Sequence, residues 1–296
     1  MKAFDIAGLP RDEVSRFVRG THSDPFRLLG PHRVGDDLEV RIFRPDARVI
    51  DIVLDREPEK PIAAERIHQD GFFCATIAGA PRDVPYHLQI ISWDGSQQRT
   101  RDPYQYGPIM GEVDLHLFAE GQHWKIYEKF GAHLRTIGDA AGVYFAVWAP
   151  NAQRVSVVGD FNNWDGRVNP MRKLIGSGVW ELFLPGLKQG VHYKFEIRGQ
   201  TGALLLKSDP FAFFNQHGKS TASLVYDLER YTWNDSAWME SRRTRDWPRS
   251  AISIYEVHLG SWRRKTEEGN RQLSYLELAE ELLPYALEMG YTHIEL

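Results

Sequence analysis

The sequence predicts a mainly β chain, with two tandem β-sandwiches of the immunoglobulin type followed by one strand–helix–strand unit. Three observations predict this fold class. A strand-rich segment of roughly a hundred residues occurs twice, and turn residues separate the short strands of each copy. A helical hydrophobic period longer than two or three turns appears only near the C-terminus. Of the 296 residues, 42% are hydrophobic and 26% charged, which is ordinary for a globular protein of two or three domains.

The two copies keep one constant spacing along the chain. The segment 38–49 resembles the segment 143–155, and beyond these segments the register does not drift. Gly71, Phe73, Gly79, Tyr86, Gly95 and Asp102-Pro103 are each matched 107 residues later by Gly178, Trp180, Gly186, Tyr193, Gly202 and Asp209-Pro210. We interpret this register as a duplicated domain. We therefore expect Tyr86 and Tyr193 to face equivalent cores.

Alternation of apolar and polar residues predicts the strands. Tyr193 and Phe195 alternate with Lys194 and Glu196, which is typical of a half-buried strand. Three other segments lie outside this pattern. Residues 11–19 predict a short helix that ends at Gly20, residues 110–133 a partly helical stretch, and residues 232–250 a polar interdomain linker.

The period changes in the last 46 residues, 251–296. Residues 251–259 and 291–296 read as strands, and Ser274 with Glu277 forms a capping box that begins a helix between them. Gly290 is placed to cap its C-terminus, while Pro284 should kink or shorten it. The apolar face expected for this helix consists of Leu276, Ala279, Leu283 and Ala286. Strand, helix and strand in this order predict a βαβ unit.

Four segments resemble one enzyme family. Gly159-Asp-Phe-Asn-Asn-Trp-Asp165 resembles the loop of the glycogen-binding sandwich module of the alpha-amylase superfamily. The segments 254–264 and 290–296 resemble the first two barrel strands of bacterial glycogen branching enzymes, and the segment 22–30 resembles the start of their extra N-terminal module. The resemblance covers nearly the whole chain and implies that it is the N-terminal portion of such an enzyme.

The resemblance implies a set of domains with definite limits. An N-terminal β-sandwich module with a short leading helix would span residues 1–107, a connector 108–140, and a glycogen-binding-type sandwich 141–228. A linker would follow at 229–250, and residues 251–296 would begin a truncated (β/α)₈ barrel, which takes about 250 residues when complete.

The family's chemistry is implied in the same way. Its members cleave an α-1,4-glucan with retention and transfer the segment to a glucan 6-hydroxyl, using carboxylates on later barrel strands. None of those motifs occurs before Leu296, so no catalytic, cofactor-binding or metal-binding residue is assigned, and the chain alone is expected to be inactive.

Trp164 and Lys194 are the candidate substrate-binding residues. In glucan-binding relatives a tryptophan and a lysine at these motif positions contact the sugar, and an indole suits the C–H face of a sugar ring. This chain departs from those relatives at Arg198-Gly-Gln-Thr-Gly202, where they carry a second tryptophan. The first copy has no counterpart of Trp164, and His87 replaces Lys194. Packing of Trp164 against a neighbouring domain is the preferred alternative.

Other residues are better explained by structure. Glu256 and His258 lie on the expected first barrel strand with only Glu295 as a second carboxylate, so a packing role is favoured over acid–base catalysis. Gly218-Lys219-Ser220 lacks the earlier glycine of a phosphate loop, since Phe213 stands there. Cys74, the only cysteine, is expected to be a packed core thiol.

The expected partner is α-1,4-glucan or glycogen. A net charge of −4 gives no general attraction to nucleic acid or anionic membrane, and the N-terminus shows no signal peptide. We expect a cytoplasmic monomer without cofactors. Two alternatives stay open: a free-standing carbohydrate-binding or scaffold protein, and another enzyme of the superfamily, such as a debranching enzyme or a trehalose-forming hydrolase.

Overall fold

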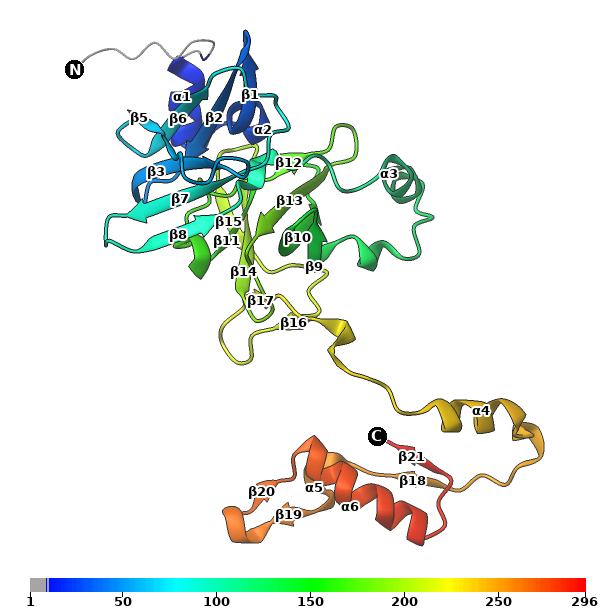
Figure 1. Ribbon diagram of the computed structural model, residues 1–296. Coiled ribbons are helices and arrows are strands. Elements are labelled where there is room, and N and C mark those ends of the chain that lie inside the picture. The colour runs from blue at the N-terminus through cyan, green and yellow to red at the C-terminus, as the bar shows by residue number, and fades with distance from the viewer. Residues whose placement is uncertain (1–8, 10) are drawn as a thin grey trace. The chain divides into compact units, whose positions relative to one another are not determined.

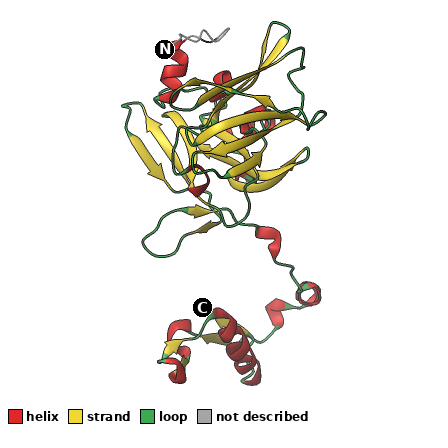
Figure 2. Cartoon of the chain, turned by 60° about the vertical axis from the view of Figure 1, so that its left-hand side comes forward, coloured by secondary structure: helices red, strands yellow, loops and turns green. Residues whose placement is uncertain are grey.

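The computed structural model describes residue 9 and residues 11–296. The chain divides into two compact units, Met1–Arg230 and Tyr231–Leu296, and each is described here by itself (Figure 1). The first unit consists mostly of strands, with few and short helices (Figure 2). Its strands form antiparallel sheets in two groups that follow the repeat.

The first module of this unit comprises two short helices and eight strands. These are α1 (Arg11–Val18), α2 (Pro25–Leu28), β1 (Gly30–Val34), β2 (Asp37–Phe43), β3 (Ala47–Leu54), β4 (Ile62–Ala63), β5 (Glu65–His68), β6 (Phe72–Ile77), β7 (Tyr86–Ser92) and β8 (Gln97–Thr100). They form two four-stranded sheets with the orders β1-β2-β6-β5 and β4-β3-β7-β8. The helix predicted over residues 11–19 is confirmed, and Gly20 ends it with a φ of 67°.

Apolar and polar residues alternate along these strands, and the apolar side chains of both sheets form one core between them. Val40 and Phe73 from one sheet and Ile52 and Leu88 from the other belong to the same buried cluster. On the opposite face of β2, Arg41 donates two hydrogen bonds to Glu39, of 3.0 and 2.7 Å, so this buried pair of charges is satisfied.

The second module follows a connector that contains η1 (Pro103–Gln105), α3 (Glu112–Ala119) and η2 (Ile126–Glu128). Its elements are β9 (Gly131–Ile137), β10 (Ala140–Trp148), β11 (Ala152–Gly159), η3 (Asp160–Asn162), β12 (Arg172–Lys173), β13 (Val179–Pro185), β14 (His192–Gly199), β15 (Leu204–Lys207), β16 (Phe214–Asn215), β17 (Ser223–Leu224) and η4 (Leu228–Arg230). The two sheets have the orders β12-β13-β10-β9 and β11-β14-β17-β16, and β15 also pairs with β14.

Two expectations for the connector have different outcomes. The partly helical stretch expected over residues 110–133 is present as α3 and η2. However, β9 lies inside the segment assigned to the connector and pairs with β10, so that segment supplies an edge strand of the second module. The local sequence could not assign β9 to the second module, because only its pairing with β10 shows that it belongs there.

The repeat reappears in the structure at the same spacing. Strands β6, β7 and β8 are followed 107 residues later by β13, β14 and β15. The Tyr86 hydroxyl donates to Asp102 at 2.7 Å, and the Tyr193 hydroxyl donates to Asp209 at 2.6 Å. Both tyrosines have 0% exposure, which confirms that they face the cores. Trp180, the counterpart of Phe73, is equally buried, and its indole N–H donates to the Ala149 carbonyl at 3.0 Å.

The two modules pack directly against each other. Phe17 of α1 and Phe43 of β2 belong to the same buried cluster as Phe145 and Tyr193 of the second module. Arg154 of β11 donates to the Gly20 carbonyl at 2.8 Å, and Arg167 donates to the Val18 carbonyl at 3.4 Å. The end of α1 is therefore held by side chains of the second module.

The second unit contains a short parallel pair and one long helix. Its elements are α4 (Ser236–Thr244), η5 (Trp247–Arg249), β18 (Ile254–Glu256), α5 (Leu259–Trp262), β19 (Arg264–Lys265), η6 (Thr266–Glu268), β20 (Arg271–Gln272), α6 (Tyr275–Glu288) and β21 (His293–Glu295). β18 and β21 pair in parallel, and β19 and β20 form a hairpin. The order strand, helix and parallel strand agrees with the predicted βαβ unit.

The ends of α6 agree with the sequence, but its buried face agrees only in part. Ser274 and Glu277 form the capping box, and Gly290 follows the helix with a φ of 78°. The helix continues four residues past Pro284, so the expectation of a shortened helix is wrong. Of the expected apolar face, Ala286 is confirmed as buried, whereas Leu276, Ala279 and Leu283 are exposed and Leu278 and Leu282 are buried in their place. Both sets have helical spacing, and only packing against the rest of the unit selects one.

One further expectation needs correction, and the expected linker contains a helix. The segment 232–250 follows the boundary between the two units and includes α4, whose Trp238 is 56% exposed. Cys74 is only half-buried, because it alternates with the buried Phe73 and Ala75 and so faces away from their core. Burial raises the pKa of its thiol to about 12, and the charge of Glu39 adds to the effect.

Candidate functional site

The candidate glucan site begins in the loop that follows β11. The Gly159 N–H donates to the Asn162 side-chain oxygen at 3.0 Å. The Asn162 amide in turn donates to the Val157 carbonyl and to the Asn169 side chain, both at 2.9 Å. Asn162 is buried, so it holds the shape of the loop and is not free to bind a ligand.

Trp164 occupies a backbone conformation that bulky residues rarely adopt. Asn163 and Trp164 have φ values of 53° and 59°, in the left-handed region. The Trp164 N–H donates to the Gly159 carbonyl at 3.0 Å, and its indole N–H donates to Asp160 at 2.8 Å. These bonds fix a strained residue whose ring stays partly exposed. Strain of this kind often occurs where a side chain is held ready for a ligand.

Lys194 lies beside the base of this loop. On β14 it pairs with Val158, and the preceding Tyr193 pairs with Gly159. The predicted alternation is confirmed, since Tyr193 is buried and Lys194 is half-buried on the opposite face. The Lys194 ammonium donates to the Thr221 hydroxyl at 2.8 Å. A sugar hydroxyl would have to share or replace that bond.

Part of the same face of β14 is covered by the first module. Glu196, two residues after Lys194, forms an ion pair with Arg154, which also reaches the Gly20 carbonyl. Arg167 also contacts the first module at two places. It donates a hydrogen bond to the Val18 carbonyl, and its guanidinium lies 5.8 Å from the ring centroid of Phe43. Packing between modules therefore occupies Arg154, Glu196 and Arg167, and it leaves Trp164 partly exposed.

In the first module, the position that corresponds to Lys194 has a structural role. His87, the counterpart of Lys194, is buried, and its Nδ1 lies 3.3 Å from both Asp55 and Arg99. It belongs to an internal polar network.

In the second module, the turn between β14 and β15 carries no aromatic residue. It closes through a hydrogen bond of 2.9 Å that the Gly199 N–H donates to the Ala203 carbonyl.

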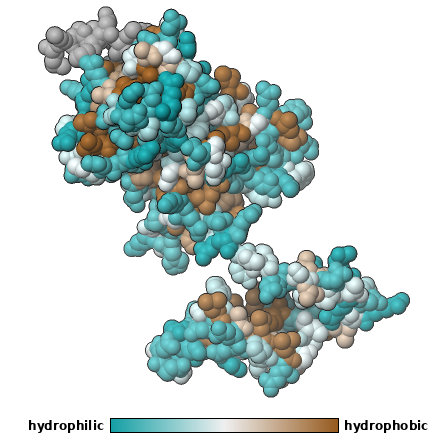
Figure 3. Space-filling view, viewed as in Figure 1, coloured by the Kyte–Doolittle hydropathy of each residue, from teal (hydrophilic) through white to brown (hydrophobic). Residues whose placement is uncertain are grey.

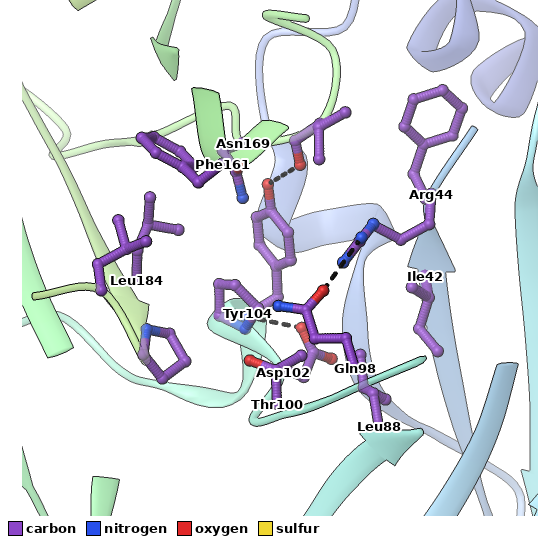
Figure 4. Close-up of a pocket in the computed structure, with 15 residues that line it drawn as sticks. Ile42, Arg44, Leu88, Gln98, Thr100, Asp102, Tyr104, Phe161, Asn169 and Leu184 are labelled. Atoms are coloured by element: carbon purple, nitrogen blue, oxygen red, sulfur yellow. Dashed lines mark hydrogen bonds between the residues drawn. The ribbon is translucent and has the colours of Figure 1, made fainter. Parts of the chain in front are cut away.

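A small cavity lies at the junction of the two modules (Figure 4). Its volume is about 90 Å³, and Arg44, Gln98 and Tyr104 from one side meet Phe161 and Asn169 from the other. Figure 4 shows the Tyr104 ring standing in the middle of these residues, with its hydroxyl bonded across the junction. No motif in the sequence indicated this cavity, because its lining combines residues far apart in the chain.

The candidate acid–base residues lie in the second unit. Glu256 and Glu295 are register partners on β18 and β21, and both are exposed. His258 is the residue before α5, and its Nδ1 lies 3.0 Å from the Ser261 hydroxyl. Gly218, in the rejected phosphate motif, lies in an exposed loop with a φ of 83°.

Two further properties apply to residue 9 and residues 11–296. Their His, Cys, Asp and Glu side chains form no group of three or more that could hold a metal ion. No helix among these residues combines the length and the apolar character needed to cross a membrane.

Known protein families match both modules. Residues 10–104 match the family alpha-1,4-glucan branching enzyme GlgB, N-terminal domain. Residues 129–212 match Carbohydrate-binding module 48 (Isoamylase N-terminal domain).

Curated relatives match nearly the whole chain. The 1,4-alpha-glucan branching enzyme GlgB of Paramagnetospirillum magneticum is 47% identical over 284 residues, which are 96% of this chain and 38% of that protein. The enzyme of the same name from Rubrobacter xylanophilus is 46% identical over 97% of this chain and 39% of its own length. The chain thus spans about two-fifths of the length of these relatives.

Solved structures resemble the chain only distantly. Pullulanase complexed with maltotriose from Anoxybacillus sp. LM18-11 is 16% identical, with a TM-score of 0.41, and covers 88% of this chain and 37% of its own.

Proposed function

Because the chain is similar over nearly its whole length to the N-terminal portion of 1,4-alpha-glucan branching enzymes, we propose that it is that portion of such an enzyme. The whole protein would cleave an α-1,4-glucan, hold the segment as a glycosyl-enzyme and transfer it to a 6-hydroxyl, with retention at the anomeric carbon. The continuous match across both modules and the second unit is the observation that carries this proposal.

The architecture we propose follows the same comparison. Each module would be an immunoglobulin-like β-sandwich, and β18, α6 and β21 would form the first βαβ unit of a (β/α)₈ barrel. The paired sheets of each module and the parallel register of β18 and β21 support this interpretation. The proposed domain limits are those expected from the sequence, with β9 added to the second module.

We propose that the chain by itself has no catalytic activity. A retaining transfer needs a nucleophile and an acid about 5–5.5 Å apart on either side of the bond that breaks. The resemblance places these carboxylates on later barrel strands, and none of their motifs occurs in residues 1–296, where Glu256 and Glu295 are exposed register partners on β18 and β21.

The test is a branching assay on the purified 296-residue chain. Loss of iodine colour from amylose and new α-1,6 ends should both stay at the level of the blank. A chain extended to the length of the relatives should form branches. Branching by the short chain would contradict its proposed inactivity, and an inactive long chain would contradict the proposed enzyme.

We propose that Trp164, with Lys194, contacts glucan at the surface of the second module. Ring stacking contributes about 0.5–1.5 kcal/mol beyond the area it buries, and a millimolar dissociation constant needs about −4 kcal/mol. One indole and a few hydrogen bonds support millimolar binding of maltooligosaccharides. The remaining proposals are a monomer in the cytoplasm that binds neither nucleic acid nor membrane and uses no cofactor.

Replacement of two tryptophans tests this site. Trp164→Ala should clearly reduce retardation in glycogen-containing native gels while the melting temperature changes little. Trp180→Ala removes a fully buried indole and should lower stability by about 3–5 kcal/mol. Unchanged retardation of a folded Trp164→Ala chain would show that glucan binds elsewhere.

A further inference from the structure

We propose that a second glucan-binding site lies in an open cleft between the two modules, around Trp93. The junction cleft has a volume of about 400 Å³ and is lined by Arg44, Asp46, Trp93 and Gln98 of the first module and by Phe161 and Asn163 of the second. The choice of ligand rests on the proposed function. The location rests on the geometry of the cleft.

Trp93 provides an exposed and well-positioned aromatic surface. Its side chain is 63% exposed at the turn between β7 and β8. The Trp93 N–H donates to the Asp46 carbonyl at 3.1 Å, and Gly95 closes the turn by donating to the Ser92 carbonyl at 3.0 Å. The Arg66 guanidinium lies 5.3 Å from the ring centroid, so one face of the indole is covered by a cation and the other is left for a ligand.

Planar polar groups stand beside this ring. Arg44 donates two hydrogen bonds to Asp46, of 2.9 and 2.7 Å, and its Nη2 lies 3.4 Å from the Gln98 amide oxygen. The same contact between Arg44 and Gln98 is drawn in Figure 4, because both residues also line the small cavity of about 90 Å³ at the junction of the modules. Carboxylate, guanidinium and amide groups can each pair with neighbouring hydroxyls of a sugar ring.

The charges of the cleft favour a neutral ligand. Burial opposes ionisation of Asp46, but the Arg44 hydrogen bonds outweigh it and hold its pKa below the usual value. Asp94 accepts hydrogen bonds from the Ser96 hydroxyl and N–H, which also lower its pKa. Each carboxylate is thus ionised and already has a partner within the protein. A polyhydroxyl chain satisfies such groups without bringing a new charge.

The loop of the second module contributes to both proposed sites. Phe161 and Asn163 line the junction cleft, and Trp164 follows directly. The left-handed conformation of Asn163 and Trp164 therefore sets the shape of the cleft wall as well as the position of the Trp164 ring. An aromatic ring on each module, with polar groups between the modules, suits a ligand longer than a single sugar.

The experiment follows the indole N–H signals of the nine tryptophans by NMR while maltoheptaose is added to the 296-residue chain. The Trp93 signal is assigned by its loss in Trp93→Ala. We expect this signal to shift with a saturating, millimolar curve, both in the native chain and in Trp164→Ala. Trp93→Ala should weaken the binding that remains in Trp164→Ala by about tenfold, which corresponds to about 1.4 kcal/mol.

Two controls make the result decisive. Trp124 is 86% exposed and is not among the residues that line the junction cleft, so Trp124→Ala should change nothing. Cellohexaose, the β-linked counterpart, should shift the Trp93 signal much less than maltoheptaose does. Equal shifts by both sugars would overturn the assignment to α-glucan.

The possible failures are distinguishable. A Trp93 signal that stays still while the Trp164 signal saturates would overturn the junction cleft and leave the proposed function intact. If neither signal moves up to tens of millimolar maltoheptaose, the proposed glucan binding of this chain fails, and the junction cleft fails with it.

Discussion

Single residues of the two modules repeat one arrangement, a buried tyrosine that donates to a buried aspartate. Desolvation raises the pKa of Asp102 and of Asp209 to about 6, although each accepts hydrogen bonds from a tyrosine and from a backbone N–H. The unfolded value of this carboxyl is close to 3.8. The folded chain therefore retains these protons between about pH 4 and pH 6, where the unfolded chain has lost them. The contribution of each carboxyl to stability falls as the pH rises through that window.

Asp102→Asn should therefore stabilise the chain at neutral pH more than at acidic pH. The asparagine can still accept from the Tyr104 N–H and can donate to the Tyr86 oxygen, while the buried charge is removed. The difference in unfolding free energy between Asp102→Asn and the native chain should grow by up to about 3 kcal/mol between pH 4 and pH 6 and then level off. Urea unfolding at pH 4.5 and pH 7.5 measures it. A gain that shrinks as the pH rises would contradict the direction of the shift.

At the scale of elements, α6 shows how local bonds define the limits of a helix. The Ser274 hydroxyl accepts from the Glu277 N–H at 3.3 Å, and the Glu277 carboxylate accepts from the Ser274 N–H at 2.7 Å. Glu277 also accepts two bonds of 2.8 Å from Arg271, and these lower its pKa strongly. The capping box therefore also joins the helix to β20.

Ser274→Ala should destabilise the second unit by about 1 kcal/mol, because the Glu277 N–H loses its acceptor. Faster amide hydrogen exchange at residues 275–278 would show it. Ser274→Asp is the matched control, since aspartate is an equally good N-cap and should restore protection. Equal exchange in the alanine variant and the native chain would show that packing alone fixes this helix end.

The limits of these elements could be predicted because the signals act within one turn of the chain. Gly20, Ser274 and Gly290 decide their helix ends through neighbouring backbone groups. The buried face of α6 could not, because two apolar sets share the helical period. The site shows the same division. Trp164 and Lys194 belong to short motifs, whereas the junction cleft joins Trp93 to Asn163 through tertiary packing.

At the scale of the whole molecule, the chain divides into two compact units, with the boundary in the sequence between Arg230 and Tyr231. The segment after that boundary contains large exposed side chains, among them Tyr231, Trp233 and Trp238, which are 64%, 74% and 56% exposed. Exposed segments with few buried contacts open most easily and are cut first by proteases.

Brief chymotrypsin digestion should therefore cut within residues 231–250 first and release a stable fragment that ends near Arg230. Mass spectrometry of the early products identifies the cut. Trp93, although 63% exposed, lies in a hydrogen-bonded turn between β7 and β8 and should resist cleavage longer. Early cleavage at Trp93 would contradict the rigid turn on which the junction cleft depends.

The solitary thiol of Cys74 gives this protein an intrinsic reporter of opening. With a pKa of about 12, it is almost entirely protonated at pH 8, so a disulfide reagent should react with the folded chain far more slowly than with a free thiol. It lies on β6, which pairs with β2 and β5, so rapid labelling requires the first module to open. The labelling rate in increasing urea should therefore follow the unfolding of the first unit, whose two modules share a buried cluster, while hydrogen exchange in α6 follows the second unit. Since Cys74 is the only cysteine of the chain, this labelling experiment needs no engineered variant.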